Sequence, residues 1–323
     1  MVSLVGAADI EAAAERIRGV AARTPLIDVP VRFEGRPEGV TPHSIGLKCE
    51  NFQPMGAFKL RGAYNMIARL SPDVRAAGVV TYSSGNHGQA VALAAQRLRI
   101  PAVVVMPTSA PHVKVDGVRR YGGEVVFAGT TSVDRRGAAE EIARTRGLTI
   151  VPPFDHPWII AGAGTCGLEI LEQKPGVTAV YVPVGGGGLI SGVAAAIKGR
   201  AAVIRVVGVE PSGAATMLAS RKAGVPVRLD RTSSIADGLL PLQPGDLTFA
   251  HVQAFVDDLV VVDDDAIKEA VRWLFREAHI VAEPSGAASV AAALASGADA
   301  TEKMVAVVSG GNVSPEDYAR YIT

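Results

Sequence analysis

The chain has 323 residues, with 32 Lys plus Arg against 32 Asp plus Glu, so its formal net charge is zero. This balance argues against nucleic acid as a partner, and the length favours two subdomains over one compact domain. The two cysteines, Cys49 and Cys166, are too few for a disulfide framework and wrongly spaced for zinc. The acidic N-terminal stretch has no long apolar run, so we expect neither a signal peptide nor a membrane helix. We therefore expect a cytoplasmic protein without membrane partners.

The N-terminal part is predicted to contain a helix over 9–20, a loop over 32–43 and a strand over 45–49. From Gly56 onward apolar residues recur at helical spacing, so Lys59 lies in the first turn of a second helix. The positive end of the helix dipole lowers the pKa of an ammonium at that position. Most lysines are ordinary solvated residues, but one with a lowered pKa suits Schiff-base chemistry with an aldehyde.

Strands and helices alternate regularly between residues 78 and 152. Continuous apolar strands separated by helices predict a parallel sheet that is covered on both faces. Pro152-Pro153 then marks a break in the pattern. We therefore expect a small inserted α/β domain over 78–152 and a large domain formed by 1–77 and 153–323. The predicted strands are 78–82, 102–106, 124–127 and 148–151, and the predicted helices are 86–98, 111–121 and 133–146.

The alternation resumes in the C-terminal half, which completes an α/β fold of two mainly parallel sheets flanked by helices. Residues 225–251 are rich in Pro and Gly and are predicted to be irregular, and such long segments are often functional or form an interface. The predicted strands are 178–184, 203–209, 255–262 and 304–308. The predicted helices are 162–173, 189–198, 213–223, 264–279, 284–294 and 315–321.

Four consecutive glycines, Gly185 to Gly188, lie between a buried strand and a helix. Glycines at such a turn let backbone N–H groups approach a phosphate, and the helix N-terminus adds positive potential. A tight turn between a strand and a helix needs only one glycine. Four consecutive glycines therefore favour phosphate binding over close packing alone. The same layout, followed by a strand and Glu210, also occurs in dinucleotide sites. The G-x-G-x-x-G spacing fails at Ser191, so a nicotinamide-dependent oxidoreductase is a distant alternative.

A polar segment, Ser83-Ser84-Gly85-Asn86-His87, joins the strand over 78–82 to the next helix. Its hydroxyl and backbone N–H groups would hold a carboxylate at the helix N-terminus. One serine would be explained by a role as the helix N-cap alone. The whole segment, however, offers more hydrogen-bond donors than a cap needs. His87 has no partner at the spacing of a metal site. We therefore interpret the segment as a carboxylate-binding loop.

These motifs together resemble, in identity and order, the pyridoxal-phosphate (PLP) enzymes of fold type II, and among them the threonine dehydratase and serine racemase family. The resemblance covers nearly the whole chain and implies two open, twisted sheets with PLP in the cleft between them, as in the tryptophan synthase β-like fold. The motifs that carry it are Gly56-Ala57-Phe58-Lys59-Leu60-Arg61-Gly62-Ala63, Ser83-Ser84-Gly85-Asn86-His87-Gly88-Gln89, Gly185–Gly188, Glu283-Pro284-Ser285-Gly286 and Ser309-Gly310-Gly311-Asn312.

The resemblance also implies the cofactor contacts. Lys59 would hold PLP, and Phe58 would lie against the ring. Asn86 would meet the ring hydroxyl, Glu283 would lie near the ring, and the hydroxyl of Ser309 would meet the pyridine nitrogen. A neutral hydroxyl there makes the ring a weaker electron sink than an aspartate would, which favours β-elimination over transamination. The phosphate would be bound by Gly185, Gly186, Gly187, Gly188 and Leu189.

The implied reaction is β-elimination from an L-β-hydroxy amino acid, threonine or serine or both, giving a 2-keto acid and ammonia with Lys59 as general base. The substrate carboxylate would be held by Ser83, Ser84, Asn86 and His87. A serine or aspartate-type racemase is an alternative, in which Ser84 returns a proton to the face opposite Lys59. A further alternative is a dehydratase of another β-hydroxy amino acid, such as 3-hydroxyaspartate or phenylserine.

A divalent cation and a homodimer are also suggested by the resemblance. Glu210 and Ala214 fall where some relatives bind Mg²⁺ or Ca²⁺. This chain has Thr216 where those relatives have a second carboxylate, and hard cations favour several charged oxygens. Thr216 therefore argues against the metal site, and both alternatives, with and without a cation, are kept. The chain stops soon after Ser309, so we do not expect the effector control of longer biosynthetic dehydratases.

Overall fold

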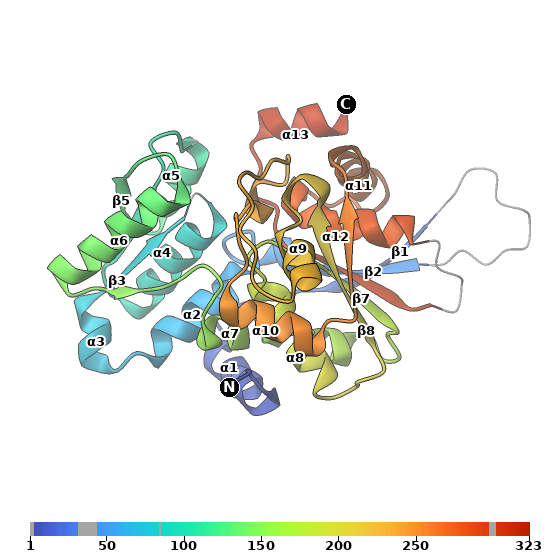
Figure 1. The fold of residues 1–323 in the computed structure, drawn as a ribbon, viewed down its shortest axis with the longest axis horizontal. Coiled ribbons are helices and arrows are strands. Elements are labelled where there is room, and N and C mark those ends of the chain that lie inside the picture. The colour runs from blue at the N-terminus through green and yellow to red at the C-terminus, as the bar shows by residue number, and fades with distance from the viewer. Residues whose placement is uncertain (1–2, 32–43, 84, 111, 297–301) are drawn as a thin grey trace, which may run out of the picture.

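The computed structural model describes residues 3–31, 44–83, 85–110, 112–296 and 302–323. Figure 1 shows two groups of elements side by side, each built on its own sheet. The six-stranded sheet has the order β1-β2-β10-β7-β8-β9, and the four-stranded sheet has the order β5-β4-β3-β6. Within these sheets every adjacent pair is parallel except β1 with β2, so the predicted fold class is confirmed.

The strand bounds follow the apolar runs of the sequence closely. The six-stranded sheet contains β1 Leu26–Pro30, β2 Ser44–Cys49, β7 Ala179–Pro183, β8 Arg205–Pro211, β9 Asp258–Val262 and β10 Met304–Val308. The four-stranded sheet contains β3 Val79–Tyr82, β4 Ala102–Met106, β5 Glu124–Phe127 and β6 Thr149–Ile150.

The α-helices are α1 Ala7–Ile17, α2 Lys59–Arg69, α3 Pro72–Ala77, α4 Asn86–Leu98, α5 His112–Arg120, α6 Ser132–Arg146, α7 Pro157–Gln173, α8 Gly188–Lys198, α9 Thr216–Ala223, α10 Asp246–Phe255, α11 Asp264–Glu277, α12 Pro284–Ala295 and α13 Pro315–Ile322. Short 3₁₀ helices are η1 Glu50–Phe52, η2 Ser212–Ala214 and η3 Asp237–Leu239. None of the described helices combines the length and apolar character needed to cross a membrane.

Helices cover both faces of each sheet, as expected for continuous apolar strands. In the four-stranded sheet, Val104 and Met106 pack against α4 and α5, whereas Val103 and Val105 pack against α6. In the six-stranded sheet, α7, α8 and α10 cover one face, and α11 and α12 cover the other. Helix α2 packs against both α4 and α7 and so links the two groups (Figure 1).

The structure corrects several predicted boundaries. Part of the segment over 225–251 is not irregular, because α10 begins at Asp246 within it, and the strand predicted over 255–262 begins only at Asp258. The N-cap of α10, Gly245, has no side chain, so the usual sequence signal for a helix start is missing. β1 and α3 were not predicted. The loop predicted over 32–43 lies outside the described residues.

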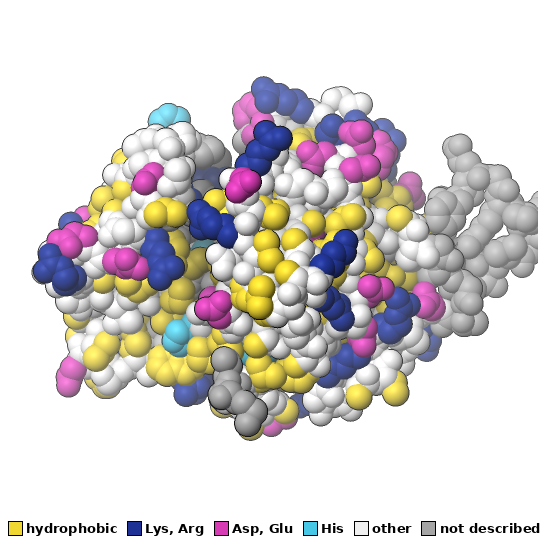
Figure 2. All heavy atoms as spheres, in the orientation of Figure 1, with side chains coloured by type: hydrophobic (Ala, Val, Ile, Leu, Met, Phe, Trp, Pro, Cys, Tyr) yellow, Lys and Arg dark blue, Asp and Glu magenta, His cyan; other side chains and the backbone are white. Residues whose placement is uncertain are grey.

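Charged side chains of both signs are scattered over the face shown in Figure 2 rather than gathered by sign. This distribution agrees with the balanced composition of the chain. It offers no basic stripe of the kind that binds nucleic acid on this face.

Candidate active site

Lys59 is the first residue of α2 and is partly buried. Its Nζ donates a hydrogen bond to the carbonyl oxygen of Pro153 at 2.8 Å and lies 5.0 Å from the centre of the Phe58 ring. Burial lowers the pKa of the Lys59 ammonium to about 8. The direction agrees with the prediction, and the cause of the lowered pKa is desolvation of the buried ammonium. A minor fraction of the amine is therefore neutral near pH 7, more than for a lysine with an ordinary pKa.

The turn after β10 holds the residues just before Lys59 in place. The N–H of Phe58 donates to the carbonyl of Ser309 at 3.0 Å, and the N–H of Gly311 donates to the carbonyl of Gly56 at 2.9 Å. Gly56 has a φ of +79°, which favours glycine. The structure thus brings Lys59 and Ser309 together from distant parts of the chain. The Ser309 hydroxyl lies 3.4 Å from the carbonyl oxygen of Ser285.

The glycine turn joins β7 to α8, as predicted. Gly187 has a φ of +93°, and a Cβ on Gly186 would lie 2.3 Å from the Phe154 ring, so neither position accepts a side chain readily. Within the part of the chain that the structure describes, the N–H groups of residues 185–189 donate no hydrogen bond to protein atoms. Open N–H groups at a helix N-terminus fit a phosphate. These residues therefore suit the phosphate of PLP.

Asn86, Glu283 and Asn312 form a hydrogen-bonded chain beside the Ser309 turn. The amide nitrogen of Asn86 donates to Glu283 Oε1 at 2.6 Å, and that of Asn312 donates to Asn86 Oδ1 at 2.8 Å. Burial, together with Asp237, raises the pKa of Glu283 to about 8, although Asn86 and Lys114 act in the opposite direction. Glu283 is therefore mostly protonated at neutral pH, and Asn86 is held in one orientation.

The predicted carboxylate-binding loop lies at the N-terminus of α4. The hydroxyl of Ser83 accepts a hydrogen bond from the N–H of Gly85 at 3.1 Å. His87 is buried, and its Nε2 lies 3.0 Å from the carbonyl oxygen of Val151. Desolvation, reinforced by Lys59, lowers the pKa of His87 to about 3, so the ring is neutral and Nε2 carries the proton that Val151 accepts. Ser84 lies outside the described residues.

Two backbone carbonyls within residues 151–153 contact predicted site residues, which the sequence did not indicate. The Val151 carbonyl faces His87, and the Pro153 carbonyl accepts from Lys59. Backbone acceptors carry no side-chain signal, so only the Pro152-Pro153 break pointed to this segment. Their roles toward cofactor and substrate, like those of the predicted site residues, stay predictions.

Glu210 has partners other than a metal ion. Its carboxylate oxygens accept hydrogen bonds from the N–H groups of Met217 and Leu218, each at 2.8 Å, at the start of α9. Desolvation raises the pKa of Glu210 to about 7 in spite of these bonds. Ala214 is buried in η2. The described residues contain no group of three or more His, Cys, Asp or Glu that could hold a metal ion, and the predicted cation stays untested.

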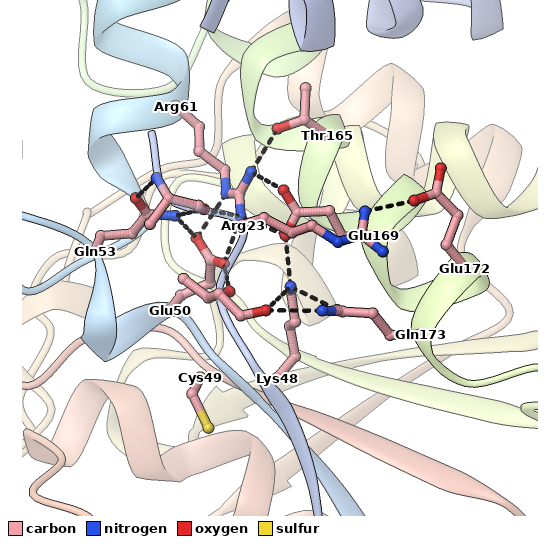
Figure 3. A network of polar contacts seen from close by, with 12 residues as sticks. Arg23, Lys48, Cys49, Glu50, Gln53, Arg61, Thr165, Glu169, Glu172 and Gln173 are labelled. Atoms are coloured by element: carbon pink, nitrogen blue, oxygen red, sulfur yellow. Dashed lines mark hydrogen bonds and ion pairs between the residues drawn. The ribbon is translucent and has the colours of Figure 1, made fainter. Parts of the chain in front are cut away.

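A buried ionic network surrounds Arg61 (Figure 3), which follows Lys59 by two residues in α2. Arg61 Nε pairs with Glu50 at 2.7 Å, Arg61 NH1 pairs with Glu169 at 2.7 Å, and Lys48 Nζ pairs with Glu169 at 2.5 Å. Burial alone would raise the pKa of Glu50, but Arg61 and Lys48 hold it below the ordinary value. The two cations and two carboxylates balance, and they connect β2, η1, α2 and α7. No local sequence pattern indicates this network, because its four residues come from separate elements.

Comparison with known proteins identifies the family. A family described as pyridoxal-phosphate dependent enzymes matches residues 17–310. The chain belongs to this family. The resemblance inferred from the motifs is thereby confirmed, and the choice between PLP and a nicotinamide cofactor is settled in favour of PLP.

The relatives of this PLP-dependent enzyme match most of the chain. It is 44% identical to the L-threonine ammonia-lyase of Thermotoga maritima over 305 residues, which cover 94% of this chain and 75% of that protein. It is 40% identical to the serine racemase of Schizosaccharomyces pombe over 317 residues, which cover 98% and 96%. It spans 53% of the biosynthetic L-threonine dehydratases of Pasteurella multocida and Escherichia coli.

The fold of this chain also matches that of a solved structure. The structure of maize serine racemase superposes with a TM-score of 0.91 at 37% identity, covering 98% of this chain and 97% of that one. The match extends over both sheets, because it covers nearly the whole of each chain.

Proposed function

We propose that this PLP-dependent enzyme is an ammonia-lyase that eliminates water from L-threonine, L-serine or both. Loss of the α-proton and the β-hydroxyl gives an enamine, which takes up water after release and yields a 2-keto acid and ammonia. The 44% identity to L-threonine ammonia-lyase over 94% of the chain carries this proposal. A neutral serine hydroxyl at position 309, where PLP is expected to place its ring nitrogen, supports elimination over transamination.

Several residues would hold the cofactor. Lys59 would bind PLP, the N–H groups of Gly185 to Leu189 would bind its phosphate, and Asn86 would contact the ring hydroxyl. Phe58, Ser309 and Glu283 would surround the ring. When bound, PLP supplies an electron sink for the bond being broken at the α-carbon. The open N–H groups of the glycine turn are the structural observation that supports this placement.

Lys59 would move the proton. Its partly neutral amine, a result of desolvation, can accept the α-proton at Nζ, and the Pro153 carbonyl holds Nζ in one place. The resulting ammonium can donate a proton to the departing β-hydroxyl. The N–H groups and hydroxyls at the start of α4, from Ser83 to His87, would bind the substrate carboxylate.

Serine racemase is the second candidate. The 40% identity to a serine racemase over 98% of the chain and the likeness to the maize structure favour it. This activity requires a second proton donor on the face opposite Lys59, and Ser84 is the residue proposed for that role.

We also propose how the protein is organised. The strands of the four-stranded sheet all come from residues between 79 and 150, which supports a small domain over 78–152 inserted in a large one. The homodimer and the cytoplasmic location remain predictions. Sedimentation of the purified protein tests the dimer.

Proton NMR in deuterated water tests the function. The full-length enzyme with PLP is given L-threonine, L-serine or L-threo-3-hydroxyaspartate separately. We expect a 2-keto acid from threonine or serine. Loss of the α-proton signal without keto acid would favour the racemase. A keto acid from 3-hydroxyaspartate alone would identify that compound as the substrate in place of threonine and serine. No reaction with any of the three would contradict both the ammonia-lyase and the racemase proposals.

A further inference from the structure

Helix α10 lies directly behind the glycine turn and is capped by a residue from far away in the chain. Asp155 accepts hydrogen bonds from the first N–H groups of this helix: those of Leu247 and Thr248 at 3.0 Å each, and that of Asp246 at 3.1 Å. A carboxylate at a helix N-terminus is favoured by the helix dipole and satisfies otherwise unpaired N–H groups. A Cβ on Gly245 would lie 2.1 Å from Asp155 Cγ, so this position must be glycine.

Thr248 connects α10 to the glycine turn. Its side chain is fully buried, and its hydroxyl donates to the carbonyl oxygen of Gly186 at 2.7 Å. Its own carbonyl accepts a hydrogen bond from the Ser191 hydroxyl of α8 at 3.2 Å. A Cβ on Gly187 would lie 2.8 Å from Thr248 Cβ. The start of α10 therefore contacts both the glycine turn and the helix that follows it.

Phe154 confines the same turn. The ring lies 2.3 Å from the Cβ position of Gly186. Its neighbours are Asp155, which caps α10, and Pro153, whose carbonyl accepts from Lys59. Residues 153–155 thus contact the catalytic lysine, the glycine turn and α10 together.

We propose that Asp155 and Thr248 are positioning residues for the cofactor phosphate. Asp155 fixes the start of α10, and Thr248 of that helix fixes the Gly186 carbonyl, which sets the direction of the neighbouring N–H groups. Glycines sample many backbone conformations, so a turn of four needs an external restraint to present its donors in one arrangement. This inference rests on the proposed phosphate site at residues 185–189.

The test compares PLP with pyridoxal, which lacks the phosphate. The full-length protein, freed of cofactor, is titrated with each compound, and the visible absorption of the bound form is followed. Thr248→Val removes the bond to the Gly186 carbonyl and the one that the hydroxyl accepts from the N–H of Gly245 at 3.0 Å. We expect this variant to raise the Kd for PLP about five- to tenfold and to leave the Kd for pyridoxal unchanged. Thr248→Ser keeps the hydroxyl and should restore PLP binding to within about twofold of wild type.

Two further variants separate positioning from lost stability. Asp155→Asn tests the other end of the connection with Thr248 intact, and we expect its Kd for PLP to rise about two- to fivefold. Ser289→Ala removes another buried hydroxyl, which donates to the Val307 carbonyl at 2.7 Å away from the glycine turn. It should bind PLP like wild type.

The outcomes distinguish the two proposals. PLP binding by Thr248→Val and Asp155→Asn as tight as in wild type would overturn the positioning role. Equal weakening for PLP and pyridoxal would overturn it as well, because the effect would not act through the phosphate. A wild-type protein that binds pyridoxal as tightly as PLP would instead refute the phosphate site itself.

Discussion

Lys59 illustrates what burial does to a single residue. Its ammonium would have an ordinary pKa in water, and desolvation lowers that pKa to about 8. The Pro153 carbonyl and the Phe58 ring hold it against the loop that follows the small sheet. Its place at the start of a helix could be predicted from periodicity, but its burial and its partner could not.

Replacing Lys59 by alanine should abolish the visible absorption of bound PLP and all measurable activity. The reason is that Nζ is the proposed attachment point and the proposed base. Absorption spectra of the variant titrated with PLP provide the measurement, and circular dichroism shows that the fold is retained. A wild-type spectrum in Lys59→Ala would contradict the assignment.

Magnesium and calcium should have little effect on the protein, because the Glu210 oxygens already accept N–H groups of α9. We expect the melting temperature to change by less than about 2 °C with either ion, which corresponds to at most about 1.4 kcal/mol for a chain of 323 residues at about 2.1 cal/mol/K per residue. A large increase with one ion that is lost in Glu210→Ala would instead establish the metal site.

At the scale of elements, α2 is held by contacts on two sides. Its charged side is tied to β2, η1 and α7 through the buried network of Figure 3. Its glycine side meets α7 so closely that a Cβ on Gly162 would lie 2.4 Å from the Arg61 carbonyl oxygen. The periodicity of apolar residues predicted α2, but these contacts determine where Lys59 is placed.

Arg61→Met should destabilise the protein by about 3–5 kcal/mol, because Glu50 and Glu169 would lose their main partner inside the protein. Urea unfolding measures the change in the free energy of unfolding. The matched control is Arg23→Met, which removes an exposed pair with Glu172 and should cost less than about 1 kcal/mol. Equal effects of the two substitutions would show that burial of the network does not matter.

Two glycine-to-alanine substitutions should have opposite effects. Gly162→Ala forces α2 and α7 apart and should cost about 1–3 kcal/mol. Gly137→Ala lies in α6 with open space around its Cβ position and should stabilise the protein by about 0.5–1 kcal/mol. Thermal unfolding of both variants compares them. A stabilising Gly162→Ala would show that the close approach of the helices is unnecessary.

At the scale of the whole molecule, buried titratable groups set the pH range of stability. His87 has a folded pKa of about 3, below its unfolded value of 6.5, so stability is lost as pH falls below 6.5. Glu283 has a folded pKa of about 8, above its unfolded value of 4.5, so stability is lost as pH rises from 4.5 to 8. Glu210 acts in the same direction as Glu283.

The free energy of unfolding, measured by urea at pH 4–9, should therefore depend on these residues. His87→Gln should reduce the loss at acid pH, and Glu283→Gln should reduce the loss between pH 4.5 and 8. Each effect is limited to about 1.4 kcal/mol per pH unit, because one proton is involved. Variants whose pH profiles run parallel to wild type across this range would refute the buried charge states.

Local sequence patterns were enough to predict the α/β class, most strands and helices, the position of Lys59 at a helix start and the glycine turn. These features depend on periodicity, glycine and proline, which act on neighbouring residues. Contacts between distant parts of the chain produce the remaining features, which are the pairing of β1, the existence of α10, the ionic network of Arg61 and the partners of Lys59 and His87. α10 shows the physical reason: its capping carboxylate, Asp155, is 91 residues away from Asp246. Such contacts leave no local pattern and form only when the chain folds.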